Sequence, residues 1–402
     1  MKLADQSYIK LHSQQVILSS IINHYPISRA KLSELTNVNK ATVSLQTYSL
    51  IEKHLVSEIG VGVSNGGRKP IMLVFNKNAG YAIGVEFAAN YILTILIDLE
   101  GNTLFSDHFE FVNESMEALK SILIERIRLV VDHAPESPYG IIGIGVGVHG
   151  FVNANETLST PHSNWNKVDL KNLLEDHFNF PVFIENEANA GAFGEKLYGA
   201  LNNSDNSIYL SVGTGIGLGI IVNSELYRGS DGVSGEMGHM IIEFNGKKCS
   251  CGNQGCWQLY ASESAFFNNL SKIKNGGEMT LKKANKMILE NDGDILMEIE
   301  KFGYFLGIGL TNMINTFNPD SIILRSNLIE ANPIILKSIK KAVSKRLSRY
   351  LPLKNEILIS QLNRNAAALG AASFLIKRFL VDSKDFKLMK DGFETSTFRR
   401  QC

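Results

Sequence analysis

Hydrophobic residues near the start of the chain recur at the spacing of helices. The apolar positions within residues 13–24 share one helical face, and Pro26 ends the helix that they predict. A second, short helix is predicted to begin at Ser28, and a third to run from Lys40 to about Lys53. Because a tight turn separates the last two, the pattern predicts helix-turn-helix architecture.

The next two apolar runs, residues 55–59 and 71–75, predict the strands of a β-hairpin. The loop between them contains two glycines followed by Arg68 and Lys69. Glycines allow the backbone to approach DNA closely, and the two basic side chains suit phosphate or minor-groove contacts. This hairpin is therefore the predicted wing, and residues 1–78 are predicted to form a winged helix-turn-helix domain.

Beyond residue 79 the pattern changes to buried strands that alternate with helices. Predicted strands cover residues 81–86, 91–98, 141–148 and 182–185, and predicted helices cover 115–133 and 187–198. A second set of strands begins at residue 207, so the chain contains two similar α/β units in tandem. Two such units imply two lobes with a cleft between them, a place that small molecules favour.

Charge is divided unevenly along the chain. The 402 residues include 40 Lys or Arg and 40 Asp or Glu, which gives a formal net charge of 0. Residues 1–77 hold nine Lys or Arg and four Asp or Glu, a net charge of +5, and the rest of the chain carries −5. A basic N-terminal domain on a mildly acidic body suits binding to a phosphate backbone.

Polar side chains on the helix-turn-helix are expected to reach DNA. A helix in the major groove can present short polar and amide groups to base edges and phosphates. The predicted DNA-contacting residues are Ser28, Arg29, Asn39, Lys40, Thr42, Ser44, Gln46, Thr47, Arg68 and Lys69. The alternative for this domain is a three-helix module that binds another protein and carries a surface hairpin.

Hydropathy predicts a cytoplasmic protein without a membrane segment. No apolar run reaches the roughly 18 residues that a bilayer crossing needs, and the first residues lack the continuous hydrophobic stretch of a signal peptide. The cysteines also favour a reducing compartment, because three of the four lie within one short segment.

That segment, residues 235–258, has the spacing of a zinc site. The predicted ligands are His239, Cys249, Cys251 and Cys256. Zn²⁺ takes a tetrahedral set of thiolate and imidazole donors, and neighbouring glycines allow a tight loop around the ion. Four protein ligands would leave no open coordination position, so the metal is expected to be structural. The alternatives are free thiols in a loop or a disulfide pair.

Two further motifs suit ligand binding at the ends of strands. Residues 213–217 alternate glycine with other residues, a turn that would allow close approach of a phosphate, although a glycine-rich hairpin has the same pattern. Asn186 and Glu187 open a predicted helix at the carboxyl end of a strand, where α/β sheets bind ligands. Carboxylates, amides and imidazoles recognise polyhydroxyl compounds. In the alternative interpretation, Glu187 only favours the helix N-terminus electrostatically.

Together these motifs resemble those of the ROK family of bacterial sugar kinases and repressors. The matching segments are Gly-Glu-Met-Gly-His at 235–239, Cys-Ser-Cys-Gly-Asn-Gln-Gly-Cys at 249–256, Asn-Glu-Ala-Asn at 186–189 and Ser-Val-Gly-Thr-Gly-Ile-Gly at 211–217. The fused N-terminal domain is typical of the repressor branch. Segments at 27–33, 66–70, 183–192 and 306–312 resemble the repressors of xylose-utilisation genes within that branch.

The resemblance implies an α/β fold in which a winged helix-turn-helix precedes a two-lobed actin-like, ribonuclease-H-like ATPase fold. Lobe 1 would span residues 79–200 together with a helix at about 365–380, and lobe 2, with the zinc site, would span 201–364. Residues 385–402 would form a tail to which no role is assigned.

The resemblance also implies a sugar bound between the lobes, with zinc ordering the loop that bears part of the site. The sugar-binding residues that it implies are His162, Asn186, Glu187, Glu236, His239 and Gln258. The chain departs from the family's pattern at His149, His162 and Gln258. Each of these positions keeps a polar side chain, so a pocket is expected, and its preferred sugar stays open.

At positions that ATP-using members of the family require, this chain has different residues. The family's Gly-Gly-Thr phosphate turn is Ala-Ala-Asn at residues 88–90, its catalytic aspartate is Glu187, and its glycine pair near adenosine is Arg325-Ser326. Phosphoryl transfer depends on close positioning of substrate and nucleotide, so these changes predict a protein that is not an enzyme.

The sequence therefore predicts a sugar-responsive transcriptional repressor. A homodimer would bind palindromic operator DNA and release it when an effector sugar, D-xylose by the resemblance, binds between the lobes. One alternative is a sugar kinase with an accessory DNA-binding domain. The other is a DNA-binding protein that no longer senses any sugar.

Overall fold

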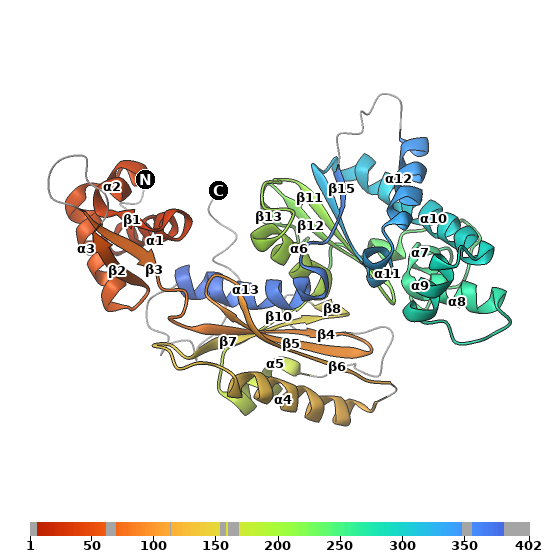
Figure 1. Ribbon diagram of the computed structural model, residues 1–402, viewed down its shortest axis with the longest axis horizontal. Coiled ribbons are helices and arrows are strands. Elements are labelled where there is room, and N and C mark those ends of the chain that lie inside the picture. The colour runs from red at the N-terminus through yellow and green to blue at the C-terminus, as the bar shows by residue number, and fades with distance from the viewer. Residues whose placement is uncertain are drawn as a thin grey trace.

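The computed structural model describes residues 6–61, 70–112, 114–152, 158–159, 169–347 and 356–381. Figure 1 shows three parts: an N-terminal head at one end, lobe 1 beside it, and lobe 2 on the far side of lobe 1. The predicted contacts Arg68, Lys69 and His162, and the tail 385–402, lie outside the described residues. No helix in the described ranges combines the length and apolar character that a bilayer crossing requires.

The head contains three helices and a small antiparallel sheet. Its helices are α1 (Gln6–His24), α2 (Arg29–Thr36) and α3 (Lys40–Glu52), and its strands are β1 (Ile27–Ser28), β2 (Val56–Val61) and β3 (Ile71–Phe75) in the order β1-β3-β2. The Ser28 side chain accepts a hydrogen bond from the backbone N of Lys31, and that of Asn39 accepts one from the backbone N of Thr42. These two caps fix where α2 and α3 begin.

Lobe 1 is a five-stranded mixed sheet in the order β10-β7-β4-β5-β6. Its strands are β4 (Tyr81–Phe87), β5 (Tyr91–Asp98), β6 (Thr103–Glu110), β7 (Ile141–Val148) and β10 (Val182–Asn186), with β8 (Phe151–Val152) and β9 (Leu158–Ser159) as a separate small pair. Its helices are α4 (Met116–Asp132), α5 (Leu170–Phe178) and α6 (Glu187–Tyr198). The α4 helix covers one face of the sheet (Figure 1).

Lobe 2 has a second five-stranded sheet in the order β13-β12-β11-β14-β15. Its strands are β11 (Ser207–Val212), β12 (Ile216–Val222), β13 (Glu225–Leu226), β14 (Ser321–Arg325) and β15 (Glu356–Ile359). Its helical elements are η1 (Met237–His239), α7 (Gln258–Ala261), α8 (Glu263–Ile273), α9 (Leu281–Leu289), α10 (Gly293–Phe317), α11 (Asn327–Ala331), α12 (Ile334–Arg346) and η2 (Asn363–Asn365). A large core around Trp257 and Phe302 joins the sheet to these helices.

Two helices form the layer between the lobes. Helix α13 (Ala366–Val381) crosses back onto β4 and β7 of lobe 1, and α6 packs on β11 and β12 of lobe 2. The two helices pack closely against each other, and a Cβ at Gly370 would collide with the backbone oxygen of Ala190. The sheets, their order and this central helix pair confirm the two-lobed actin-like fold that the resemblance implied.

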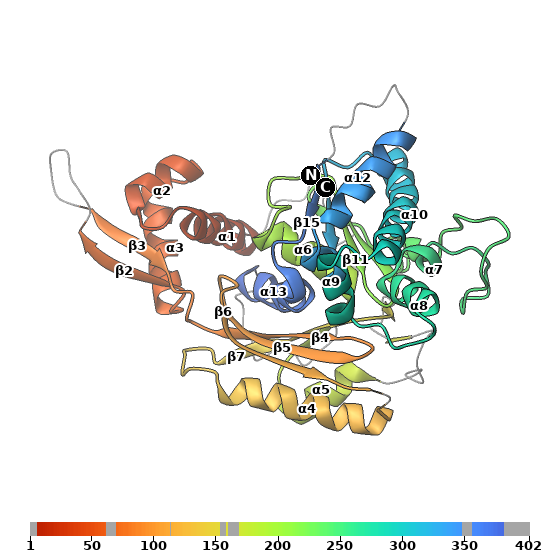
Figure 2. The same cartoon turned by 45° about the vertical axis from the view of Figure 1, so that its right-hand side comes forward.

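The head is seated on lobe 1 and on the end of α13 (Figure 2). Head residues such as Ile21 and lobe 1 residues such as Leu99 share one hydrophobic cluster with Ile376 and Phe379 of α13. The Tyr139 hydroxyl donates to the backbone oxygen of Lys53 at 2.9 Å, and the Gln15 amide donates to that of Val381 at the same distance. The C-terminal part of α13 therefore connects the head to the helix layer between the lobes.

Candidate effector pocket and metal-binding loop

A pocket of about 650 Å³ lies between the two lobes. This volume falls within the range of roughly 300–1,000 Å³ for small-molecule sites. Lobe 1 contributes His149, Asn186 and Glu187, and lobe 2 contributes the 213–217 turn and the start of α8. Side chains from distant parts of the chain therefore face one cavity.

Five of the six sugar-binding residues that the resemblance implied line this pocket. They are Asn186, Glu187, Glu236, His239 and Gln258; the sixth, His162, lies outside the described residues. Asn186 caps α6, because its side-chain oxygen accepts the backbone N–H of Ala188 at 2.9 Å and its amide donates to the Gly150 oxygen at 2.9 Å. Burial raises the pKa of the Glu236 carboxyl to about 7. The pocket thus combines two amides, an imidazole and two carboxyl groups, which can hydrogen-bond to the hydroxyl groups of a sugar.

Glu86 forms a polar cluster with His149 and Glu187, which line the pocket, and one ligating atom of each lies within 4.8 Å of the others. His149 Nε2 lies 3.1 Å from Glu86 Oε1, which also accepts a hydrogen bond from the Tyr91 hydroxyl. Ser211 of lobe 2 donates to Glu187 at 2.8 Å. His149 and Glu187 stand out in the sequence as departures from the family's pattern, but nothing in the sequence indicates that they converge with Glu86, which lies 101 positions before Glu187.

The protonation of this cluster is coupled. Burial alone would raise the pKa of Glu86, but the hydrogen bond and charge of His149 and the charge of Arg325 outweigh it, so the pKa is lowered. Burial would lower the pKa of His149, yet Glu187 and Glu86 raise it. Burial and the negative charge of Glu86 raise the pKa of Glu187. The cluster therefore favours ionised Glu86 beside protonated His149.

Arg325 supplies a second internal cation near this cluster. It ends β14, is 8% exposed, and its guanidinium donates to Asn327 at 3.2 Å and lies 3.5 Å from Glu330. Its charge contributes to the lowered pKa of Glu86 and opposes the rise in the pKa of Glu187. Buried carboxylates need positive charge close by, and here the chain itself provides it.

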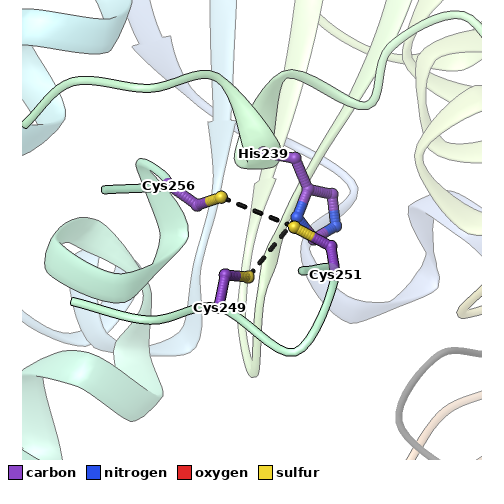
Figure 3. Close-up of side chains that lie close together, drawn as sticks. All are labelled: His239, Cys249, Cys251 and Cys256. Carbon is purple, nitrogen blue, oxygen red and sulfur yellow. Dashed lines mark hydrogen bonds between the residues drawn. The ribbon is translucent and has the colours of Figure 1, made fainter. Parts of the chain in front are cut away.

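The four predicted zinc ligands meet at one point on lobe 2 (Figure 3). All four ligating atoms lie within 4.8 Å of one another, with Cys251 Sγ 3.6 Å from Cys256 Sγ and Cys249 Sγ 3.7 Å from His239 Nδ1. Four ligands at about 2.1–2.3 Å in a tetrahedron lie roughly 3.5–3.8 Å apart, whereas a disulfide would bring two sulfurs to about 2.05 Å. The donor set and its spacing fit Zn²⁺, and all three cysteines are free thiols.

The loop folds around this point because glycines allow its turns. Gly252 and Gly255 have φ values of +95° and +78°, and a Cβ at Gly255 would collide with the backbone of Glu243. Burial beside the other thiols raises the pKa of Cys256 to about 12, so three thiolates need a cation to coexist. Gln258 Nε2 lies 3.7 Å from Cys249 Sγ, which connects the metal-binding loop directly to the pocket.

An ion pair joins the two lobes beside the pocket. Arg228, which follows β13, donates from Nε at 2.8 Å and from Nη2 at 2.7 Å to the same oxygen of Glu185. The other Glu185 oxygen accepts the backbone N–H of Asn186 at 3.0 Å and the amide of Asn189 at 3.1 Å. The Arg228 guanidinium also lies 5.2 Å from the ring centre of Phe374. Residues 229–235 lead directly from Arg228 to Glu236. The ion pair therefore connects the segment that carries Glu236 to the strand end that carries Asn186.

The structure corrects part of the predicted DNA-binding face. Gln46 and Thr47 do not face outward: they are 3% and 0% exposed, because Val43, Gln46, Thr47 and Leu50 form the stripe of α3 that packs inside the head. Lys40 and Ser44 are exposed and Thr42 is half-buried. Ser28 and Asn39 are the caps described above, and Arg29 pairs with Glu58 at 2.6 Å.

The family model that describes the ROK family matches residues 82–378. The chain belongs to the ROK family. This ROK protein is 50% identical over 381 residues to the xylose repressor of Bacillus spizizenii, a match that covers 94% of this chain and 99% of the repressor.

Among solved structures, a ROK family transcriptional regulator that is a homologue of the Escherichia coli Mlc protein matches 93% of this chain and 97% of its own, with a TM-score of 0.78 and 26% identity. The ROK family glucokinase of Streptomyces griseus, solved with glucose and AMPPNP, matches 73% of this chain and 99% of its own, with a TM-score of 0.67 and 26% identity. The regulator therefore matches the head as well as the two lobes, and the kinase matches a share of the chain that corresponds to the lobes alone.

Proposed function

We propose that this ROK protein is a transcriptional repressor of xylose-utilisation genes that leaves its operator when D-xylose binds between the lobes. The observation that carries the proposal is the match to a named xylose repressor along 94% of the chain, head included. The pocket supports it, because amide, imidazole and carboxyl groups from both lobes face a cavity of sugar size.

The route from pocket to head is short. Asn186 caps α6, α6 packs along α13, and the end of α13 contacts the head. A ligand that holds the lobes in one arrangement can therefore bias the position of the head. Its effect on DNA binding is limited to the difference between its affinities for the DNA-competent and DNA-incompetent arrangements.

Kinase activity is the competing function, and the local chemistry opposes it. The first N–H groups of α11, next to the Arg325-Ser326 pair, are already bonded: Leu328 N donates to Glu263 at 2.8 Å, and Ser326 N donates to Glu330 at 3.1 Å. Arg325 fills the space beside them with a charged side chain. Adenosine would have to displace the Arg325 side chain and these hydrogen bonds, so we propose that the protein has no kinase activity.

Two further parts of the proposal concern assembly and metal. We propose a homodimer, because a palindromic operator presents two equivalent half-sites to two heads. We also propose one structural Zn²⁺ per chain on His239, Cys249, Cys251 and Cys256. Bound there, the ion would supply the positive charge that the thiolates need and would hold the loop that carries His239 against the pocket.

The test is binding of the full-length protein to duplex DNA from upstream of xylose-utilisation genes, at fixed salt, with and without millimolar D-xylose. We expect specific binding that xylose releases and that L-arabinose at the same concentration does not. Specific binding that xylose leaves unchanged would overturn xylose as the effector. Formation of ADP and a sugar phosphate from Mg-ATP and any aldose would overturn the non-enzymatic assignment.

A further inference from the structure

The outward face of α3 carries apolar side chains beside exposed Lys40, Ser44 and Glu52. Ala41, Leu45 and Tyr48 follow each other at spacings of four and three residues, so they lie on one face of the helix. Leu45 is 62% exposed and Tyr48 is 59% exposed. Two large exposed apolar side chains within one turn, on a helix whose opposite face is fully packed, form a surface that suits contact with a partner.

The polar groups that could read base edges from α3 are bound within the head. Gln46 accepts a hydrogen bond from Gln14 at 3.3 Å, and Asn39 accepts the backbone N–H of Thr42 at 2.8 Å. The Ser44 hydroxyl donates to the backbone oxygen of Lys40 at 2.9 Å. Amide and guanidinium groups are the usual readers of purines in the major groove, and α3 places neither on its outward face.

We propose that α3 recognises operator DNA through thymine methyl groups, with Leu45 as the central contact and Ala41 and Tyr48 on either side. This inference rests on the proposed DNA-binding function, and it names thymine as the base that α3 recognises. Only thymine offers a methyl group in the major groove, and aliphatic side chains contact it favourably.

Charge on the head identifies DNA as the occupant of this apolar face. Residues 1–77 carry a net charge of +5, and exposed Lys40 begins the helix that bears the face. Basic groups around the helix would hold the phosphates, which fixes register without reading sequence. The apolar face at the centre would then select half-sites with thymine opposite Leu45.

The experiment selects duplexes from a random pool with the full-length protein at fixed salt and then replaces each thymine of the best duplex with deoxyuridine. This substitution removes one methyl group and keeps every hydrogen-bonding atom of the base. We expect at least one position in each half-site at which binding weakens about fourfold, the effect of one buried methyl-sized group. Leu45→Ala should weaken binding to the thymine duplex by a similar factor or more, with no further loss from deoxyuridine at that position.

Matched variants distinguish contact with thymine methyl groups from a general effect of losing an exposed apolar side chain. Leu289→Ala removes an 83% exposed leucine from α9, outside the head, and should leave DNA binding unchanged. Tyr48→Phe keeps the ring and should keep the thymine preference beside it, which Tyr48→Ala should reduce. A selected duplex that is indifferent to deoxyuridine, or a Leu45→Ala variant with the wild-type deoxyuridine penalty, would overturn the inference and leave the repressor proposal intact. Failure to select any specific duplex would overturn both.

Discussion

Two clusters of ligating side chains border the same pocket, and they are built in opposite ways. The metal-binding loop takes His239, Cys249, Cys251 and Cys256 from 18 consecutive residues of lobe 2. Glu86 comes from β4, His149 follows the end of β7, and Glu187 begins α6, all in lobe 1. We propose that the first cluster holds an external cation, whereas the charges of the second are balanced by His149 and Arg325 of the chain itself. The two clusters have similarly close ligating atoms, yet we expect only the first to depend on a metal ion.

The largest effect is expected at the metal-binding loop. Cys256→Ser should reduce bound zinc from one equivalent per chain to near zero and lower the free energy of unfolding by about 3 kcal/mol or more, because metal binding and loop folding are coupled. Metal analysis of purified protein and urea denaturation measure the two effects. Cys402→Ser changes the remaining cysteine and should alter neither. Full zinc retention in Cys256→Ser would refute the ligand assignment and remove the contrast between the clusters.

A smaller effect is expected where the chain supplies its own cation. Arg325→Met should lower the free energy of unfolding by about 2–4 kcal/mol, because Glu86, Glu187 and Glu330 then lose the buried positive charge of Arg325. Zinc content should stay unchanged. Adding Glu86→Gln should restore part of the loss, which a double-mutant cycle by urea denaturation measures. Arg346→Met, which removes an arginine over the ring of Tyr304, is the control, and an equal loss there would show that the Arg325 effect is not electrostatic.

The pH dependence of stability distinguishes the clusters further. The pKa of His149 is raised in the folded protein, so its ion pair stabilises the fold below the ordinary histidine pKa of about 6.5 and is lost as pH rises through the folded value. His149→Gln should therefore lower the melting temperature more at pH 6 than at pH 9, which thermal unfolding followed by circular dichroism at the two pH values measures. An equal loss at both pH values would contradict protonation of His149.

The smallest effect is expected at the ion pair that links the segments carrying the two clusters. Arg228→Ala should weaken binding of the effector sugar about fivefold, a loss of about 1 kcal/mol, because Glu236 and Asn186 are then less firmly positioned. Zinc content should be unchanged. Calorimetric titration with D-xylose measures the affinity, and Arg126→Ala, which breaks an ion pair on the surface of lobe 1, is the control. Unchanged sugar affinity in Arg228→Ala would limit this pair to a structural role.

The same contrast explains what the sequence could predict. The four candidate metal ligands lie close together in the sequence, so their spacing alone predicts that they form one site. The structure places their ligating atoms within reach of one ion. The cluster of Glu86, His149 and Glu187 depends on the parallel pairing of β4, β7 and β10, which sequence patterns do not specify. Parallel pairing places the carboxyl ends of these strands side by side, and their polar residues meet only there.

In the head, the positions of the helices were predictable but the rotation of α3 was not. Polarity suggested that Gln46 and Thr47 face solvent, whereas packing against α1 places them in the buried stripe and leaves Leu45 and Tyr48 exposed. Packing against the neighbouring helix decides which face of a helix is buried. A polar residue buried in that interface looks the same in the sequence as a polar residue on the surface.

Helix α13 has a consequence for how the protein is made. Lobe 1 is discontinuous: its sheet and the seat of the head form from the first half of the chain, yet the helix that covers β4 and β7 is synthesised after all of lobe 2. The head can fold soon after it leaves the ribosome, but its contacts with α13 form only after that helix has been released. The link between the head and the helix layer that borders the pocket is therefore completed late in biosynthesis.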